Sequence, residues 1–126
     1  MQISKEIENI IPEIRSWRHT LHAHPELGYE EKWTSDFVAD KLQSFGIEVH
    51  KGLGGTGVVG VLKGLDVHLG GGGNKAIGLR ADMDALPLTE ENDFLYKSKF
   101  DGRMHACGHD GHTAMLLGPA NLLASR

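Results

Sequence analysis

The sequence predicts an α/β fold, in which helices precede and follow a small set of strands. Apolar residues recur at helical spacing over residues 4–22, over 31–45 and from about Asp110 onward. Between these segments, β-branched and apolar residues form short runs bounded by glycine clusters, a pattern typical of strands. Elements in this order indicate a sheet covered by helices on both faces. A chain of 126 residues is long enough for one such core.

The first two predicted helices each contain or adjoin a residue that restricts the backbone. Pro12 lies inside the first helix, and it predicts a kink or a division near Ile11 because proline removes a backbone donor and constrains the residue before it. Gly46 directly follows the second helix, where it is well placed as a C-terminal cap.

Three strands are predicted, with the sequences IEVHK (47–51), GVVGVLK (57–63) and AIGLRADM (76–83). A glycine-rich connection joins the last two, which we therefore expect to be antiparallel neighbours. The segment GTGVVG matches a dinucleotide-binding fingerprint, but a strand rather than a helix follows it, so that function is rejected.

The C-terminal part is predicted to be a long loop over 86–103, followed by a helix that Pro119 should disturb. The apolar helical pattern is still running at the last residues, NLLASR. We therefore expect the chain to be a fragment of a larger protein.

The composition excludes several classes of function. A net charge of −4 without a Lys/Arg cluster argues against nucleic-acid binding. No apolar run approaches the roughly 20 residues that cross a membrane, and an acidic N-terminus is unlike an export signal. The single cysteine excludes an internal disulfide, and a cytoplasmic location is expected.

The segment MHACGHDGH (104–112) concentrates potential metal ligands. If it is extended, Cys107 and His109 project to the same side, and Gly108 between them lets the backbone bend. Thiolate and imidazole together suit zinc, and the positive end of the following helix favours the thiolate. Asp110 and His112 are candidates for orienting these ligands. The alternative is an inert buried cysteine with locally satisfied histidines, but so dense a cluster favours a metal site.

Two ligands leave a site incomplete, because zinc takes about four. The remaining candidates are His105, His112, Asp82, Asp84 and His24. Asp82 and Asp84 end the third predicted strand, where both carboxylates would face one point. Capping of a turn before Pro87 explains the same pair equally well. A structural role is preferred for the histidines at the end of the first helix, His22 and His24.

Three segments together resemble one family: WRHTLHAHPELGYEE, GLRADMDALP and above all MHACGHDGHTAMLLG. They are similar to the hippurate hydrolase branch of the metal-dependent amidohydrolases. That branch includes N-acyl-amino-acid amidohydrolases and indole-acetyl-amino-acid hydrolases, with aminoacylases and carboxypeptidase G as more distant relatives. The resemblance runs through essentially the whole chain. It implies a three-layer αβα zinc-peptidase-like catalytic domain of which residues 1–126 are the N-terminal part, and a homo-oligomer formed through a separate dimerisation domain.

The resemblance also implies roles for single residues. Cys107 and His109 match metal ligands, Asp84 matches a residue that orients a ligand, and Asp82 stands where the distant relatives have a ligand histidine. A complete site would hold two divalent ions (Zn, Mn, Ni or Co), and its other ligands and its glutamate base would lie beyond residue 126. The implied reaction is hydrolysis of the amide bond of an N-acyl amino acid, such as hippurate, by a metal-activated water. The chain alone is then expected to be inactive.

Two other functions remain open on the residues themselves. One is a small non-catalytic metal-binding module, closed by Cys107 and His109 with two of His105, His112 and His24. The other is a cysteine hydrolase, in which Cys107 is the nucleophile and a nearby histidine is the base. The Cys-Gly-His spacing suits an ion better than a nucleophile–base pair.

Overall fold

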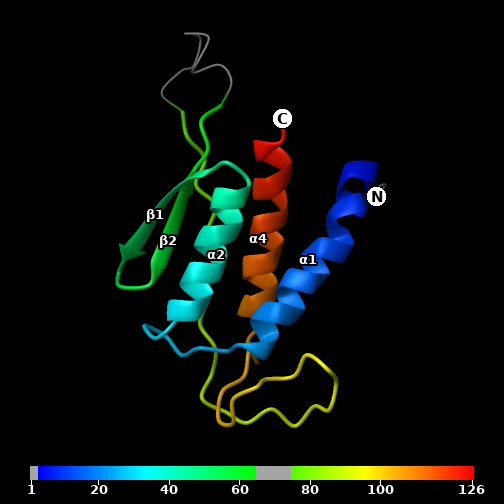
Figure 1. The fold of residues 1–126 in the computed structure, drawn as a ribbon, viewed down its shortest axis with the longest axis vertical. Helices are drawn as coiled ribbons and strands as arrows, with labels where there is room; N and C mark the ends of the chain where they lie inside the picture. The colour runs from blue at the N-terminus through cyan, green and yellow to red at the C-terminus, as the bar shows by residue number, and fades with distance from the viewer. Residues whose placement is uncertain (1–2, 65–74) are drawn as a thin grey trace.

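The computed structural model describes residues 3–64 and 75–126, and its elements confirm the α/β class. Within these two ranges, three helices lie beside a two-stranded antiparallel sheet (Figure 1). The helices are α1 (Lys5–Ala23), α2 (Lys32–Ser44) and α4 (His109–Ala124), and the strands are β1 (Glu48–Leu53) and β2 (Gly57–Val61). Helix α4 packs against both α1 and α2, so the last element in the chain lies next to the first.

The hydrophobic core lies where the three helices meet. Its buried members come from one face of each helix: Ile10, Trp17, Leu21, Val38, Ala114 and Leu117. These faces agree in part with those that helical periodicity predicts, since apolar residues three or four apart share one side of a helix. Ile7, Ile11, Met115 and Leu123 belong to the apolar patterns but are exposed. The core therefore holds the C-terminal end of α1 against the first turns of α4.

Pro12 and Pro119 lie inside helices that continue through them, so of the two outcomes predicted for Pro12, a kink or a division near Ile11, the division does not occur. Helix α1 runs unbroken past Pro12, and α4 past Pro119. A proline inside a helix costs about 3 kcal/mol, because it removes one backbone hydrogen bond and its ring clashes with the preceding turn, whereas burying a large apolar side chain contributes about 1.5–3 kcal/mol. Around Pro12, burial of Ile10, Trp17 and Leu21 outweighs the local loss, and in α4 the buried residues, such as Ala114 and Leu117, lie before Pro119.

The end of α2 confirms the predicted glycine cap. Gly46 has a left-handed backbone, with φ of 78°. Its amide donates to the carbonyl of Gln43 at 2.9 Å, and the amide of Ile47 donates to the carbonyl of Leu42 at 3.1 Å. This pair of bonds is a Schellman motif, which satisfies two carbonyls that the helix leaves free. It turns the chain directly into β1.

Strand pairing differs from the prediction. β2 pairs with β1, in a register that sets Glu48 opposite Val61, and not with the 76–83 run. Residues 75–84 form no strand, because an extended chain needs a neighbour to pair with and no strand lies beside this segment in the described part of the molecule. The glycine-rich connection predicted between these runs falls on residues 65–74, outside the described residues.

The way in which helices cover the sheet also differs from the prediction of helices on both faces. Helix α2 packs on one face, where Val58 contacts the core and Gly60 lies close to Leu42. On the other face Val59 and Val61 are exposed. Within residues 3–64 and 75–126, helices therefore cover only one face of this hairpin.

Residues 86–103 form a loop, as predicted, at the end of the molecule where α1 ends and α4 begins (Figure 1). Leu86 and Met104 form an antiparallel bridge at its base, and the amide of Lys99 donates to the carbonyl of Ala23. The same loop base carries a parallel bridge between Leu27 and Ala85. Among the helices that can be described, none is apolar over a length that would cross a membrane.

Candidate metal site

The candidate ligands gather around the first turn of α4. Gly108 adopts a left-handed conformation, with φ of 86°, and the amide of His112 donates back to its carbonyl at 3.1 Å. Cys107 lies in the bend just before this glycine and is exposed. The expectation of an extended 107–109 segment is wrong, because the left-handed glycine turns the chain sharply and His109 already begins the helix.

His109 is held by Asp84. Its Nδ1 lies 2.8 Å from Asp84 Oδ1 and 3.1 Å from the Asp84 carbonyl oxygen, so the ring N–H donates to this residue. A neutral imidazole that donates from Nδ1 keeps the lone pair of Nε2 for a metal ion. A carboxylate behind a ligand histidine is the usual means of fixing the ring and making it more basic.

A second carboxylate–histidine pair lies alongside the first. His112 Nδ1 is 2.9 Å from Asp82 Oδ1, and the hydroxyl of Thr113 donates to the Asp82 carbonyl. The hydrogen bond from His112 is the main cause that lowers the pKa of Asp82, so this carboxylate stays ionised. Ligand atoms of Asp82, His109 and His112 all lie within 4.8 Å of one another. One carboxylate and two imidazoles are a donor set that fits a divalent transition metal.

The structure separates other residues that the sequence grouped together. Asp82 and Asp84 face different histidines rather than one point. Cys107 is not among the three side chains whose ligand atoms converge. In the described part of the chain, no hydrogen bond joins its sulfur to a histidine, so the geometry of a nucleophile–base pair is not seen.

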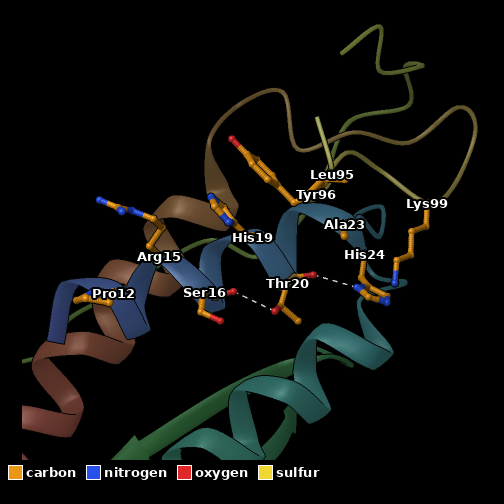
Figure 2. A pocket seen from close by; sticks show the side chains of 10 residues that line it. All are labelled: Pro12, Arg15, Ser16, His19, Thr20, Ala23, His24, Leu95, Tyr96 and Lys99. Carbon is orange, nitrogen blue, oxygen red and sulfur yellow. Dashed lines mark hydrogen bonds between the residues drawn. The ribbon is translucent and has the colours of Figure 1, made fainter. Parts of the chain in front are cut away.

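His24 lies away from this cluster and has a structural role, as preferred from the sequence. Its ring stacks on Trp33 with centroids 4.2 Å apart, and its Nδ1–H donates to the carbonyl of Thr20 at 2.9 Å. Figure 2 shows this bond in an open groove between α1 and the 86–103 loop, which is lined by basic and aromatic side chains including Arg15, His19, Tyr96 and Lys99.

His105 is buried directly behind the site. It is 4% exposed, and neither ring nitrogen has a hydrogen-bond partner among the described residues. Burial lowers the pKa of His105, so the neutral ring is favoured. It does not join the ligand atoms that converge near His109.

A polar network lies under the first turn of α4. Its four members are the buried side chains of His22, Asp110 and Glu90 and the partly exposed side chain of Arg18, and we call them the His22 network. His22 Nδ1 lies 2.8 Å from Asp110 Oδ2, and its Nε2 lies 2.6 Å from Glu90 Oε1. Arg18 Nε donates to Asp110 Oδ2 at 2.8 Å. The hydrogen bond with Asp110 is the largest cause that raises the pKa of His22, and the bond with Glu90 adds to it.

The carboxylates of this network are ionised despite their burial. Burial by itself would raise the pKa of Asp110 and of Glu90, but hydrogen bonds from His22 and charges nearby outweigh it, and both pKa values are lowered. The sequence indicated an orienting role for Asp110 and a structural role for His22. It did not single out Glu90, because this residue lies in a loop without periodicity.

The chain matches a protein-family model. Residues 78–126 match the model described as peptidase family M20/M25/M40. Over all 126 residues the chain is 52% identical to the hippurate hydrolase of Campylobacter jejuni, of which it spans 31%. The chain belongs to the M20/M25/M40 peptidase family.

Other members of this peptidase family show the same likeness. The chain is 45% identical to an N-acyl-L-amino acid amidohydrolase of Geobacillus stearothermophilus, with 98% of this chain and 32% of that protein covered. Its fold matches the crystal structure of a dinuclear metal-binding M20 peptidase of Bacillus subtilis, with a TM-score of 0.84 and 38% identity over 94% of this chain and 32% of the other. The predicted resemblance is therefore confirmed. The chain spans about a third of the length of the relatives it matches.

Proposed function

We propose that this chain forms part of a metal-dependent amidohydrolase, to which it supplies His109 and Cys107 as metal ligands and Asp84 as the carboxylate that orients His109. The observation that carries the proposal is the hydrogen bond between His109 Nδ1 and Asp84, which leaves Nε2 available for a metal. Cys107 lies two residues earlier, exposed just before the start of the same helix, where its sulfur is accessible to an ion.

The proposed reaction is hydrolysis of the amide bond of an N-acyl amino acid. A divalent cation bound here supplies Lewis acidity and lowers the pKa of a bound water. The residues of this chain would hold the cation and orient its ligands: Asp84 fixes the ring of His109, and Cys107 contributes negative charge as a ligand. Nitrogen and sulfur donors accommodate zinc, manganese, nickel or cobalt, with a preference for the softer ions. Similarity to a hippurate hydrolase and to an N-acyl-L-amino acid amidohydrolase supports this substrate class.

The remaining parts of the proposal concern the whole protein. We propose two divalent ions in the complete site, with further ligands and a glutamate base supplied by residues beyond 126, and a homo-oligomeric assembly. The chain by itself should then bind a metal ion but not hydrolyse hippurate. Residues 1–126 are accordingly the N-terminal part of the catalytic domain.

Metal binding tests the ligand assignment directly. Zinc affinity of the chain is measured by competition with a chromophoric chelator, and Cys107→Ser and His109→Ala are each expected to weaken it by about tenfold or more. Ser44→Ala, at the exposed end of α2, is the matched control. Zinc should also slow alkylation of Cys107 by iodoacetamide. An unchanged alkylation rate at saturating zinc, together with wild-type affinity in Cys107→Ser, would remove Cys107 from the site.

Activity tests the reaction class. The protein extended beyond Arg126 should release glycine from hippurate when loaded with a divalent metal, and residues 1–126 should not. Hydrolysis by residues 1–126 at an ordinary enzymatic rate contradicts the proposal, because the chain would then need no further ligand or base.

A second candidate, a small non-catalytic metal-binding module, is favoured by the convergence of Asp82, His109 and His112. In this form Asp82 and His112 take the place of Cys107, which the sequence had suggested as a ligand of such a module. It predicts that His112→Gln weakens zinc binding as strongly as His109→Ala does, and that Cys107→Ser has no effect. It also predicts loss of the fold on addition of a chelator, since in such modules binding energy is folding energy. These outcomes are opposite to those of the amidohydrolase proposal.

A further inference from the structure

Both ring nitrogens of His22 are bonded to buried carboxylates. Nδ1 is 2.8 Å from Asp110 Oδ2 and Nε2 is 2.6 Å from Glu90 Oε1. The three side chains are 3%, 1% and 2% exposed, respectively. A neutral imidazole donates from only one nitrogen, and an ionised carboxylate only accepts. The ring that fits this geometry is therefore the imidazolium, which donates to Asp110 and Glu90 at once.

The charges of the His22 network balance. Asp110 and Glu90 contribute two negative charges, and His22 and Arg18 contribute two positive charges. Arg18 Nε reaches the same Asp110 oxygen as His22 does, at 2.8 Å, and the amide of Ser98 donates to Glu90 Oε2. A buried ion group persists only when its members are paired and hydrogen-bonded in this way, since removing one partner leaves an uncompensated charge.

The partners of His22 lie next to both halves of the candidate metal site. Asp110 directly follows His109 in the first turn of α4. Glu90 lies six residues after Asp84, just past the bridge between Leu86 and Met104. One side chain of α1 is therefore bonded both to the helix turn that carries His109 and to the loop that follows the carboxylate orienting it.

We propose that His22 is a positioning residue for the candidate metal site: its charged ring joins the first turn of α4 to the 86–103 loop and so sets His109 against Asp84. The proposal rests on the proposed function only in treating His109 as a metal ligand. His22 does not touch the metal ligands; it acts through Asp110 and Glu90. The two halves of the site are also joined by the Leu86–Met104 bridge, by the Thr113 hydroxyl on the Asp82 carbonyl and by the two histidine–carboxylate bonds, and the His22 network adds a buried connection to these.

The variant His22→Gln tests the proposal, because glutamine keeps hydrogen-bonding groups but not the charge or the two-sided reach of the ring. His19→Gln is the matched control. It lies one turn earlier on α1, stacks on Tyr96 with centroids 3.7 Å apart, and faces the groove shown in Figure 2 rather than the carboxylates. Far-UV circular dichroism at low temperature establishes that each variant is folded before it is compared.

The first readout is nuclear magnetic resonance of the histidine rings in the metal-free chain. In the wild type at neutral pH both nitrogens of His22 should carry protons, and His109 should show a protected Nδ1–H bonded to Asp84. In folded His22→Gln the His109 Nδ1–H should lose its protection, whereas in His19→Gln it should remain. A purely structural His22 would lower the melting temperature and leave the His109 ring of the folded protein unchanged.

The second readout is zinc affinity, which should fall by about tenfold or more in His22→Gln and stay within about twofold in His19→Gln. A wild-type His22 ring with only one proton, or a folded His22→Gln in which both the His109 ring and the zinc affinity match the wild type, overturns the proposal. If His22→Gln does not fold, Glu90→Gln is judged by the same two readouts. If the wild type binds no zinc, the proposed function fails, while the ring signals of the metal-free chain still decide the role of His22.

Discussion

His109 Nδ1 lies 2.8 Å from a carboxylate oxygen of Asp84, although 25 residues separate the two in the chain. The bond joins the first turn of α4 to the segment that precedes the 86–103 loop. It gives the histidine one tautomer and one ring orientation, with Nε2 left for a ligand. The side chains of His109 and Asp84 are 16% and 40% exposed, so the pair faces solvent at the edge of the molecule, where an ion can enter.

Replacing Asp84 should weaken metal binding in two steps. Asp84→Asn keeps an oxygen that accepts from His109 Nδ1 but removes the charge, and Asp84→Ala removes the bond altogether. We expect zinc affinity to fall in the order wild type, Asn, Ala, by about 10- to 100-fold for Ala. The measurement is competition with a chromophoric chelator, and Asp101→Ala, exposed within the 86–103 loop, is the control. Equal affinities for Asp84→Ala and Asp101→Ala would contradict the orienting role.

Removing the metal should leave the fold intact. The core formed by Trp17, Leu21 and Leu117 with their neighbours is built by the three helices and contains none of the candidate ligands. Hydrophobic burial is the main source of stability, so the helical circular dichroism signal should not change when a chelator strips a zinc-loaded chain. The melting temperature should fall by the amount that ligand binding had added. Unfolding on chelation would instead support the metal-binding module.

The His22 network should make stability depend on pH. The pKa of His22 is raised above its ordinary value of 6.5, mainly by the bond with Asp110, so its contribution is complete below 6.5 and is lost as pH rises through the folded-state value. The pKa values of Asp110 and Glu90 are lowered from 3.8 and 4.5, so their contributions are complete above those values and are lost only as pH falls through the folded-state values. Between pH 4.5 and 6.5 all three contributions are present.

Urea unfolding of the wild type and His22→Gln checks this prediction. The difference in unfolding free energy between the two should be larger near about pH 6 than near about pH 9, because a group whose folded-state pKa is raised stabilises the fold less as pH rises above its unfolded value. Burial is the largest cause that lowers the pKa of His105 and gives a dependence of the opposite sign. That part is common to both proteins, and only the smaller part due to the charge of His22 differs between them. A difference that stays constant over this range would mean that folding leaves the pKa of His22 unchanged, and a difference that grows with pH would mean that the folded chain favours the neutral ring.

The contact between α1 and α4 leaves no room for a side chain at Gly118. A methyl group there would lie 2.5 Å from Ile14 Cδ1, whereas one at Gly111 in the same helix would meet nothing within 4 Å. Overpacking costs about 1–3 kcal/mol, against a gain of up to about 1 kcal/mol from replacing a helical glycine by alanine. Gly118→Ala should therefore lower the unfolding free energy by about 1 kcal/mol, and Gly111→Ala should raise it slightly.

The substitution Ile14→Val tests whether crowding against Ile14 causes the loss of stability expected for Gly118→Ala. Valine lacks the Cδ1 atom that meets the added methyl group, so Gly118→Ala should cost less in that background. The four proteins form a double-mutant cycle measured by urea unfolding. Additive effects of Ile14→Val and Gly118→Ala would show that the two positions do not crowd each other.

Helix positions and the glycine cap were predictable because their causes are local. The spacing of Ile10, Trp17 and Leu21 marks one face of α1, and Gly46 follows α2 where a left-handed residue is needed. The density of ligand types in 104–112 located the candidate site, and its similarity to hippurate hydrolases indicated the family that the comparisons confirm.

Strand pairing and the partners of the histidines were not predictable from local sequence. The partner of β2 is decided by which segment of the chain lies beside it in the fold. A run of β-branched and apolar residues indicates only that the segment can form a strand, not which strand it pairs with. The prediction that Cys107 and His109 project to the same side assumed an extended segment. The left-handed backbone of Gly108 bends the chain there, so that assumption does not hold.

The amino-acid sequence alone therefore determined the class of fold, the helical faces and the segment that carries the ligands, because periodicity and residue chemistry act over a few neighbouring residues. Only the tertiary structure decided that Asp84 holds His109, that Asp82 holds His112 and that His22 joins Glu90 to Asp110. These pairs are 25, 30, 68 and 88 residues apart in the chain. These side chains meet because burial of the three helical faces brings the elements that carry them together. No local sequence pattern predicts which side chains then face one another.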